Sequence, residues 1–195
     1  LLVFWPVRRW PGVRDLRFWD YWTEYFQARV VLEPGFDPSD TRPKLFAFVP
    51  HGLYPFGAAL ALVGDLNRTV FHGLRVVVAD AARRVPVFRH LLGAVGDLSA
   101  SRDAMRHALG TKKQSLALYP GGIAEMMRGD PSAAVETAML ATRKGFVKLC
   151  LQTGTPIVPV YVFGTSDTFA KVALAPQWLA RWRRVSLVRF SARCG

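Results

Sequence analysis

The chain has 195 residues, 51% of them hydrophobic, and its 26 Lys and Arg exceed its 14 Asp and Glu to give a formal net charge of +12. This length supports one domain with its own core, so folding needs no metal or disulfide. High apolar content without a short repeat excludes collagen-like, coiled-coil and disordered classes. The two cysteines, Cys150 and Cys194, are too few for a disulfide scaffold and too far apart for a zinc knuckle, which favours a reducing compartment.

Arginine rather than lysine carries most of the positive charge. Because a guanidinium can donate two parallel hydrogen bonds to a phosphate, nucleic acid, an anionic membrane surface and a small phosphorylated ligand would each fit. An arginine bias in which the charges are only solvated is the alternative. The sequence has no recognisable nucleic-acid-binding fold and no basic groove motif interleaved with aromatics, which argues against nucleic acid.

The first residues predict contact with a membrane. The chain starts at Leu1 without a methionine and ends at Gly195, so we expect it to be a piece of a longer protein. Residues 1–5 are apolar and residues 6–10 add arginine and tryptophan, which is typical of a membrane segment that meets its interface. No run within the chain reaches the ~18 apolar residues that a span needs. We therefore expect a membrane anchor upstream.

Residues 13–29 are rich in aromatic side chains and arginine, and they predict a helix. This helix either lies in a membrane interface or packs on the core. Three prolines and a glycine in residues 33–43 predict a loop. We divide the chain accordingly into a membrane-proximal segment, 1–43, and a core domain, 44–195.

Short apolar runs then alternate with segments of helical spacing. The predicted strands are 45–49, 75–79, 115–119, 157–163 and 185–190, and the predicted helices are 55–66, 81–92, 101–109, 133–153 and 178–184. Continuous apolar strands separated by helices indicate an α/β fold with a mostly parallel central sheet covered on both faces.

Two motifs follow predicted strands. Pro50-His51-Gly52 comes after the first strand, and Pro120-Gly121-Gly122 with Glu125 comes after the third. Ligands of open α/β sheets bind outside the carboxyl ends of the strands, so His51 and Glu125 can meet there. Histidine accepts a proton near neutral pH, and a carboxylate can orient its ring. The alternative without catalysis is that both motifs only form turns, as His-Gly and Pro-Gly-Gly commonly do.

Other kinds of catalytic site find no support in the sequence. The remaining histidines, His72, His90 and His107, have no metal-site spacing with each other or with the cysteines. There is no zinc-protease HExxH, no Walker-type loop and no Gly-x-Ser-x-Gly elbow. We therefore expect no metal and no prosthetic group, and favour a base that activates a substrate hydroxyl.

The ordered series of motifs resembles the diacylglycerol acyltransferase 2 family, within the wider glycerolipid acyltransferases, over roughly residues 25–170. The residues that carry the resemblance are Pro50-His51-Gly52, Ser101-Arg102, Pro120-Gly121-Gly122 with Glu125, the run Arg143–Leu149, Gly154, Val158-Pro159, and Phe163-Gly164 with Asp167. Val49 stands where animal members usually have a second histidine and plant members a glutamate. Phe56 stands where the wider acyltransferases have an aspartate, which weakens a lysophospholipid acyltransferase interpretation.

The resemblance implies transfer of a fatty acyl group from acyl-CoA, a co-substrate, to the hydroxyl of diacylglycerol, giving triacylglycerol. It implies residence in the endoplasmic reticulum membrane and on lipid droplets, with the active site on the cytosolic side. His51 matches the family's active-site histidine, and Glu125 matches the glutamate of its Pro-Gly-Gly block. The predicted substrate-binding residues are Pro50, Gly52, Pro120, Gly121, Gly122, Arg143, Lys144 and Lys148.

The chemistry of these side chains and N–H groups suggests a role for each. His51 is the candidate general base, and the N–H groups near Gly121 and Gly122 are candidates for binding an oxyanion. Lys144 and Lys148 lie one turn apart, late in the predicted helix 133–153. With Arg143 they either bind CoA phosphates or form a solvated basic face near a helix C-terminus.

Alternatives remain at this stage. Monoacylglycerol and long-chain alcohol acyltransferases use the same chemistry with another acceptor. A non-catalytic module that binds lipid at a membrane surface belongs to a different class, and a catalytically inactive fragment is a further possibility.

Overall fold

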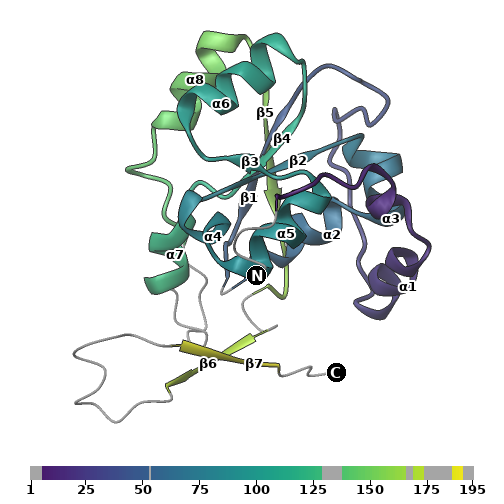
Figure 1. The fold of residues 1–195 in the computed structure, drawn as a ribbon. Helices are drawn as coiled ribbons and strands as arrows, with labels where there is room; N and C mark the ends of the chain where they lie inside the picture. Colours follow the sequence, from purple (N-terminus) through teal and green to yellow (C-terminus); the bar gives the residue numbers. More distant parts are fainter. Residues whose placement is uncertain (1–5, 53, 129–137, 166–168, 174–185, 191–195) are drawn as a thin grey trace.

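The computed structural model describes residues 6–52, 54–128, 138–165, 169–173 and 186–190 (Figure 1). A five-stranded sheet in the order β3-β2-β4-β1-β5 forms its centre. The strands are β1 (Leu45–Val49), β2 (Arg75–Val78), β3 (Leu98–Ser99), β4 (Leu116–Leu118) and β5 (Ile157–Tyr161). All four neighbouring pairs are parallel, with Leu45 level with Leu116 on one side and Ile157 on the other. The predicted α/β class with a parallel sheet is confirmed.

Alternate side chains of β1 enter two core layers, one on each face of the sheet. Phe46 and Phe48 pack with α2 (Phe56–Ala61) and with the π-helical turn η2 (Asn67–Phe71). Leu45 and Ala47 pack with η3 (His107–Thr111) and α8 (Gly145–Thr153). β1 reads as a continuous apolar run because both of its faces are buried.

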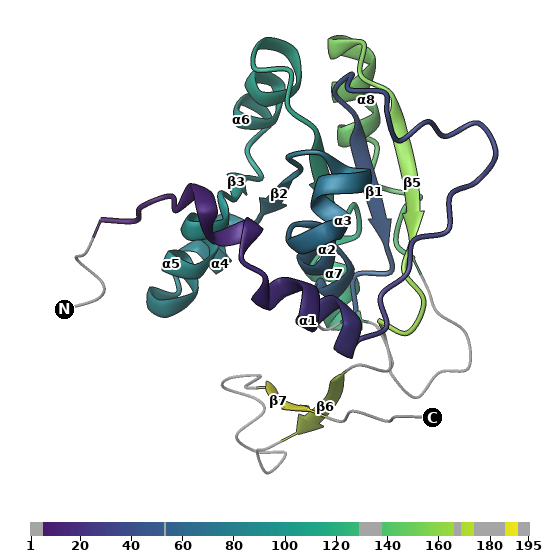
Figure 2. The ribbon, with the colours of Figure 1, turned by 90° about the vertical axis from the view of Figure 1, so that its right-hand side faces the viewer.

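Further helices complete the structure around the sheet. They are α3 (Gly64–Leu66), α4 (Asp80–Arg83), α5 (Pro86–Val95), α6 (Arg102–Arg106) and α7 (Gly122–Arg128). Figure 1 shows α6 and α8 at the upper left of the strands and α1 and α3 to their right, and Figure 2 turns this right-hand side toward the viewer.

The aromatic segment predicted at 13–29 forms η1 (Pro11–Asp15) and α1 (Phe18–Tyr25). Val13 and Trp19 belong to the first core layer, whereas Tyr21 and Tyr25 are exposed. The helix therefore packs on the core by one side and presents its tyrosines outward. None of the helices that the structure describes is long and apolar enough to cross a membrane, and residues 1–5 lie outside the described part.

Several predicted elements differ from the structure. The helix predicted at 133–153 is confirmed only over α8, from Gly145 to Thr153. Its earlier start is wrong, because residues 138–144 are not helical, and residues 133–137 lie outside the described part. The predicted final strand exists as β7 (Ser186–Phe190), but it pairs antiparallel with β6 (Phe169–Ala173) rather than joining the central sheet. The helix predicted at 178–184 lies outside the described residues.

Candidate functional site at the carboxyl edge of the sheet

The loops that follow β1 and β4 lie beside each other, because these parallel strands are direct neighbours. The connection after β1 carries α2 into the first core layer, and the connection after β4 carries α8 into the second. Adjacent strands that send their helices to opposite faces form the switch point at which open α/β sheets bind ligands. Both motifs singled out from the sequence lie at this switch point.

His51 follows β1 and is half-buried. Its Nδ1 lies 3.0 Å from the carbonyl oxygen of Gly52. A carbonyl oxygen can only accept a hydrogen bond, so this contact places the proton of the neutral ring on Nδ1. Nε2 then carries the lone pair. This is the state that a general base requires.

Glu125 lies in α7 and is only 4% exposed. Its Oε1 accepts a hydrogen bond from the main-chain N–H of His51 at 2.5 Å, and its Oε2 accepts one from the N–H of Met139 at 3.1 Å. The two residues meet, as expected from their strand ends. The carboxylate, however, contacts the main chain of His51 and not its imidazole, so it fixes the loop rather than the ring.

Two glycines are required for close approach between these loops. An ideal Cβ on Gly121 would lie 1.8 Å from Oε2 of Glu125, so any side chain there would displace the carboxylate. Gly52 has φ +61° and an ideal Cβ on it would lie 2.6 Å from Cγ2 of Thr165, in the loop after β5. The loops after β1, β4 and β5 are therefore packed directly on one another.

The N–H groups of the glycine pair differ in availability. The N–H of Gly122 donates to the carbonyl of Tyr119 at 3.1 Å, so it is not free for an oxyanion. Among the described residues, no partner is found for the N–H of Gly121. Pro50 and Pro120 are buried, which means that they shape the loops and offer little surface to a substrate.

Tyr119, which the sequence did not single out, packs its ring against the imidazole of His51. The two ring centroids are 4.9 Å apart, and the tyrosine hydroxyl accepts the N–H of Ala58 in α2 at 3.0 Å. Burial raises the pKa of Tyr119 above the ordinary range for tyrosine, so its hydroxyl stays neutral. The only signal for Tyr119 in the sequence is its position, since it ends the predicted strand 115–119 and directly precedes Pro120.

The three predicted phosphate-binding cations lie at the other end of the helix from that expected. Arg143 and Lys144 immediately precede α8, Lys148 lies inside it, and all three are exposed. The basic group is therefore at a helix N-terminus, and its first turn contains no acidic residue. Gly145 is the first residue of α8, and no atom lies within 4 Å of an ideal Cβ added to it.

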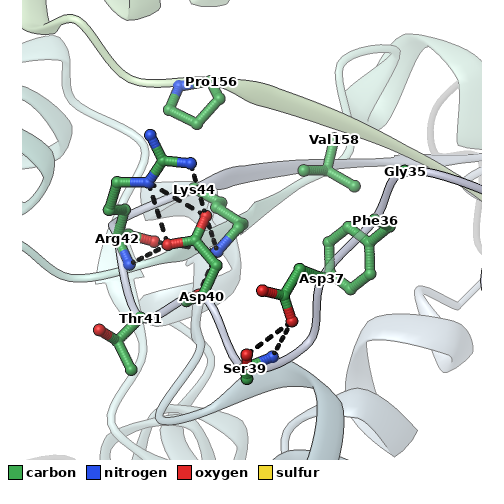
Figure 3. A pocket seen from close by; sticks show the side chains of 10 residues that line it. All are labelled: Gly35, Phe36, Asp37, Ser39, Asp40, Thr41, Arg42, Lys44, Pro156 and Val158. Carbon is green, nitrogen blue, oxygen red and sulfur yellow. Dashed lines mark hydrogen bonds and ion pairs between the residues drawn. The ribbon is translucent and has the colours of Figure 1, made fainter.

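A pocket of about 590 Å³ lies at the opposite, amino edge of the sheet (Figure 3). The residues just before β1 and β5, including Lys44 and Pro156, line it. Its polar wall is an ion-pair cluster, in which Asp40 contacts Arg42 at 3.0 Å and Lys44 at 3.2 Å. These charges satisfy one another, and the pocket is separated from His51 by the length of β1. Within the described ranges, no three His, Cys, Asp or Glu are placed to hold a metal.

The family profile and the most similar relatives point to the same family of acyltransferases. The family profile described as Diacylglycerol acyltransferase matches residues 6–189. Diacylglycerol O-acyltransferase 2 of Danio rerio is 31% identical over 188 residues, which cover 88% of this chain and 51% of that protein. The human protein of the same name is 31% identical over 181 residues, covering 90% of this chain and 46% of its own length.

A relative named for another activity is equally similar. The mouse 2-acylglycerol O-acyltransferase 1 is 31% identical over 173 residues, covering 85% of this chain and 50% of that protein. The chain thus spans about half the length of the curated relatives it matches. No solved structure matches it significantly.

Proposed function

Because the chain belongs to the diacylglycerol acyltransferase family, we propose that it transfers a fatty acyl group from acyl-CoA to the free hydroxyl of diacylglycerol, giving triacylglycerol. The observation that carries the proposal is the placement of His51 at the switch point with its Nε2 lone pair available. The proposed location is the endoplasmic reticulum membrane and lipid droplets, with the site on the cytosolic side. The partners are acyl-CoA, diacylglycerol and the membrane surface, and the step needs no cofactor.

The proposed reaction is a direct transfer. Nε2 of His51 takes the proton of the acceptor hydroxyl while the hydroxyl oxygen attacks the thioester carbonyl of acyl-CoA. The oxyanion that forms collapses, the carbon–sulfur bond breaks, and the CoA thiolate takes the proton from the imidazolium. The Nδ1–H bond to the carbonyl of Gly52 keeps the ring in one tautomer throughout.

Glu125 and Gly121 support this step in different ways. Glu125 is a positioning residue, since its carboxylate holds the main chain of His51. It also ties that loop to the segment around Met139, which leads toward α8. Of the two glycines, only Gly121 is the candidate donor to the oxyanion, because the N–H of Gly122 already donates to the carbonyl of Tyr119.

Arg143, Lys144 and Lys148 are proposed to bind the phosphates of CoA. Cations at a helix N-terminus are unfavourable toward the helix dipole, so a solvated face is a poor explanation for them there. A phosphate would be attracted both by these side chains and by the N–H groups of the first turn. The corrected helix boundary therefore favours the phosphate interpretation over the alternative.

A second acceptor has support of its own. The mouse 2-acylglycerol acyltransferase is as similar as the diacylglycerol enzymes, so monoacylglycerol is the alternative acceptor, with long-chain alcohols as a further one. A lipid-binding module without catalysis is the alternative of a different class.

The experiment that tests the proposal is acyl transfer by the purified chain with labelled acyl-CoA and, in separate reactions, diacylglycerol, monoacylglycerol and a long-chain alcohol. His51→Ala should lower the rate about 10²- to 10⁴-fold, the usual loss for a general base. His107→Ala is the matched control, because His107 is exposed and lies outside the site. Normal turnover by His51→Ala would contradict the mechanism, and no product with any acceptor would favour the lipid-binding module.

A second experiment tests the phosphate site. Lys144→Ala combined with Lys148→Ala should raise KM for acyl-CoA about tenfold or more, because each charge-assisted hydrogen bond contributes about 1.5–3 kcal/mol. KM for the neutral acceptor should stay the same. The control removes Lys112 and Lys113, an exposed pair elsewhere on the chain. Equal KM values for acyl-CoA in parent and variant would remove these lysines from the site.

A further inference from the structure

The loop that holds His51 is surrounded by exposed apolar side chains from separate elements. In the loop after β5, Phe163 is 86% exposed; at the start of α5, Val87 is 69% exposed; and in the first turn of α7, Ile123 is 49% exposed. Tyr25 at the end of α1 is 69% exposed. We name these residues, Tyr25, Val87, Ile123 and Phe163, the apolar rim.

Hydrogen bonds of neighbouring residues place two rim residues, Phe163 and Ile123, next to the site loops. Val162 donates its N–H to the carbonyl of Val49 at 2.8 Å, so Phe163 begins beside the end of β1. Ile123 lies two residues before Glu125, whose carboxylate holds the N–H of His51. The rim residues after β5 and in α7 therefore flank the histidine from two sides.

An aromatic chain across the same loop connects the sequence neighbours of the other two rim residues, Val87 and Tyr25. The ring of Phe88, next to Val87, is 6.3 Å from Tyr54, and Tyr54 is 6.4 Å from Phe56. Phe56 contacts Phe26, next to Tyr25, at 4.4 Å. Figures 1 and 2 show α1, α5 and α7 around the lower end of the sheet, where the arrowheads of β1 and β5 point.

The rim also has a basic surround. Arg29 follows α1 and Arg84 precedes α5, and both are exposed. Aromatic and aliphatic side chains with arginines beside them match the interface of a bilayer that contains anionic lipid. The net charge of +12 has the sign that such a surface attracts.

We propose that the apolar rim is the membrane-docking surface of this domain, so that the carboxyl edge of the sheet faces the bilayer and His51 opens directly onto it. This inference rests on the proposed function in one respect, namely that the acyl acceptor is a lipid. A diacylglycerol could then move from the bilayer to Nε2 without crossing water, while a phosphorylated acyl donor would approach along the basic surround.

The test is vesicle flotation of the full chain without acyl-CoA, so that the result does not depend on catalysis. Vesicles contain phosphatidylcholine alone or with phosphatidylserine. Val87→Asp, Ile123→Asp and Phe163→Asp together should lower partitioning into both kinds of vesicle about tenfold or more, because three apolar contacts are lost. Circular dichroism melting of each variant establishes that it is folded.

The matched control is Leu151→Asp. Leu151 is 80% exposed, but it lies in the last turns of α8, which lead to the amino end of β5. It should bind vesicles like the parent. Equal loss with Leu151→Asp, or parent-like binding of the triple variant, would overturn the proposal. So would a triple variant that lost self-association in sedimentation while keeping vesicle binding, since the rim would then be an interface between copies.

Discussion

Glu125→Gln tests the finding that this carboxylate fixes main chain rather than an imidazole. The glutamine keeps one acceptor oxygen but presents an NH₂ group where the second oxygen accepted an N–H. One charge-assisted hydrogen bond is lost, at about 1.5–3 kcal/mol, and a buried N–H is left facing a donor. We expect the free energy of unfolding to fall by about 2–4 kcal/mol, within the 5–15 kcal/mol typical of a domain, so the variant stays folded.

Urea unfolding with acyl transfer measured on the same preparation is the assay. Stability and rate should fall together, since both depend on the loop that Glu125 holds. The exposed Glu24, changed to Gln, is the control. An unfolding free energy for Glu125→Gln within about 0.5 kcal/mol of the parent, the range of an ordinary surface substitution, would refute the reasoning.

The same contact predicts coupling with Gly121. A Cβ there would lie 1.8 Å from Oε2 of Glu125, so Gly121→Ala disrupts the contact that Glu125→Gln also weakens. The double variant should therefore lose less stability than the sum of the single losses, by about 0.5–3 kcal/mol. Strict additivity in the double-mutant cycle would mean that the glycine and the carboxylate act independently.

Two further predictions concern loops. Gly52→Ala should destabilise the fold by about 1–2 kcal/mol from its left-handed φ alone, plus its clash with Thr165; Thr165→Ser removes Cγ2 and should recover part of the loss in a thermal melt. Hydrogen bonds from Arg42 hold the pKa of Asp40 below its usual range, so its stabilising contribution is present above about pH 4 and is lost as pH falls further. In Asp40→Asn, unfolding measured between pH 5 and 2 should depend less on pH; an unchanged slope would contradict this.

Four strands of the central sheet could be predicted from the sequence, whereas the short β3 and the helix boundaries around the site could not. The apolar run 45–49 is buried almost throughout, and this leaves a strong local signal. The segment 133–153 has high helix propensity, but Met139 donates its N–H to Glu125, and the chain turns at 141–142 before α8 begins. A tertiary contact overrides local propensity there, and a pattern of residues does not contain it.

The location of the candidate site was predictable and its atomic contacts were not. The rule that ligands bind at the carboxyl edge needs only strand ends, and it brought His51 and Glu125 together correctly. Which atoms of the two meet depends on how tightly the loops pack, and this follows from the absence of a Cβ at Gly121. Tyr119 was missed for a similar reason: its hydroxyl is satisfied by Ala58 in α2, a partner far away in the sequence.

The geometry of the site links its chemistry to its surroundings through main-chain contacts. Glu125 bonds the loop after β1 to α7 and to the segment that leads to α8, and Gly52 packs on the loop after β5. The elements that present Ile123 and Phe163 are thus the ones that hold His51 in place. A bilayer that bound Ile123 and Phe163 would therefore stabilise the elements whose contacts hold the His51 loop in place. Vesicles should therefore protect the parent chain against urea more than they protect Glu125→Gln, and equal protection would separate membrane docking from the placement of His51.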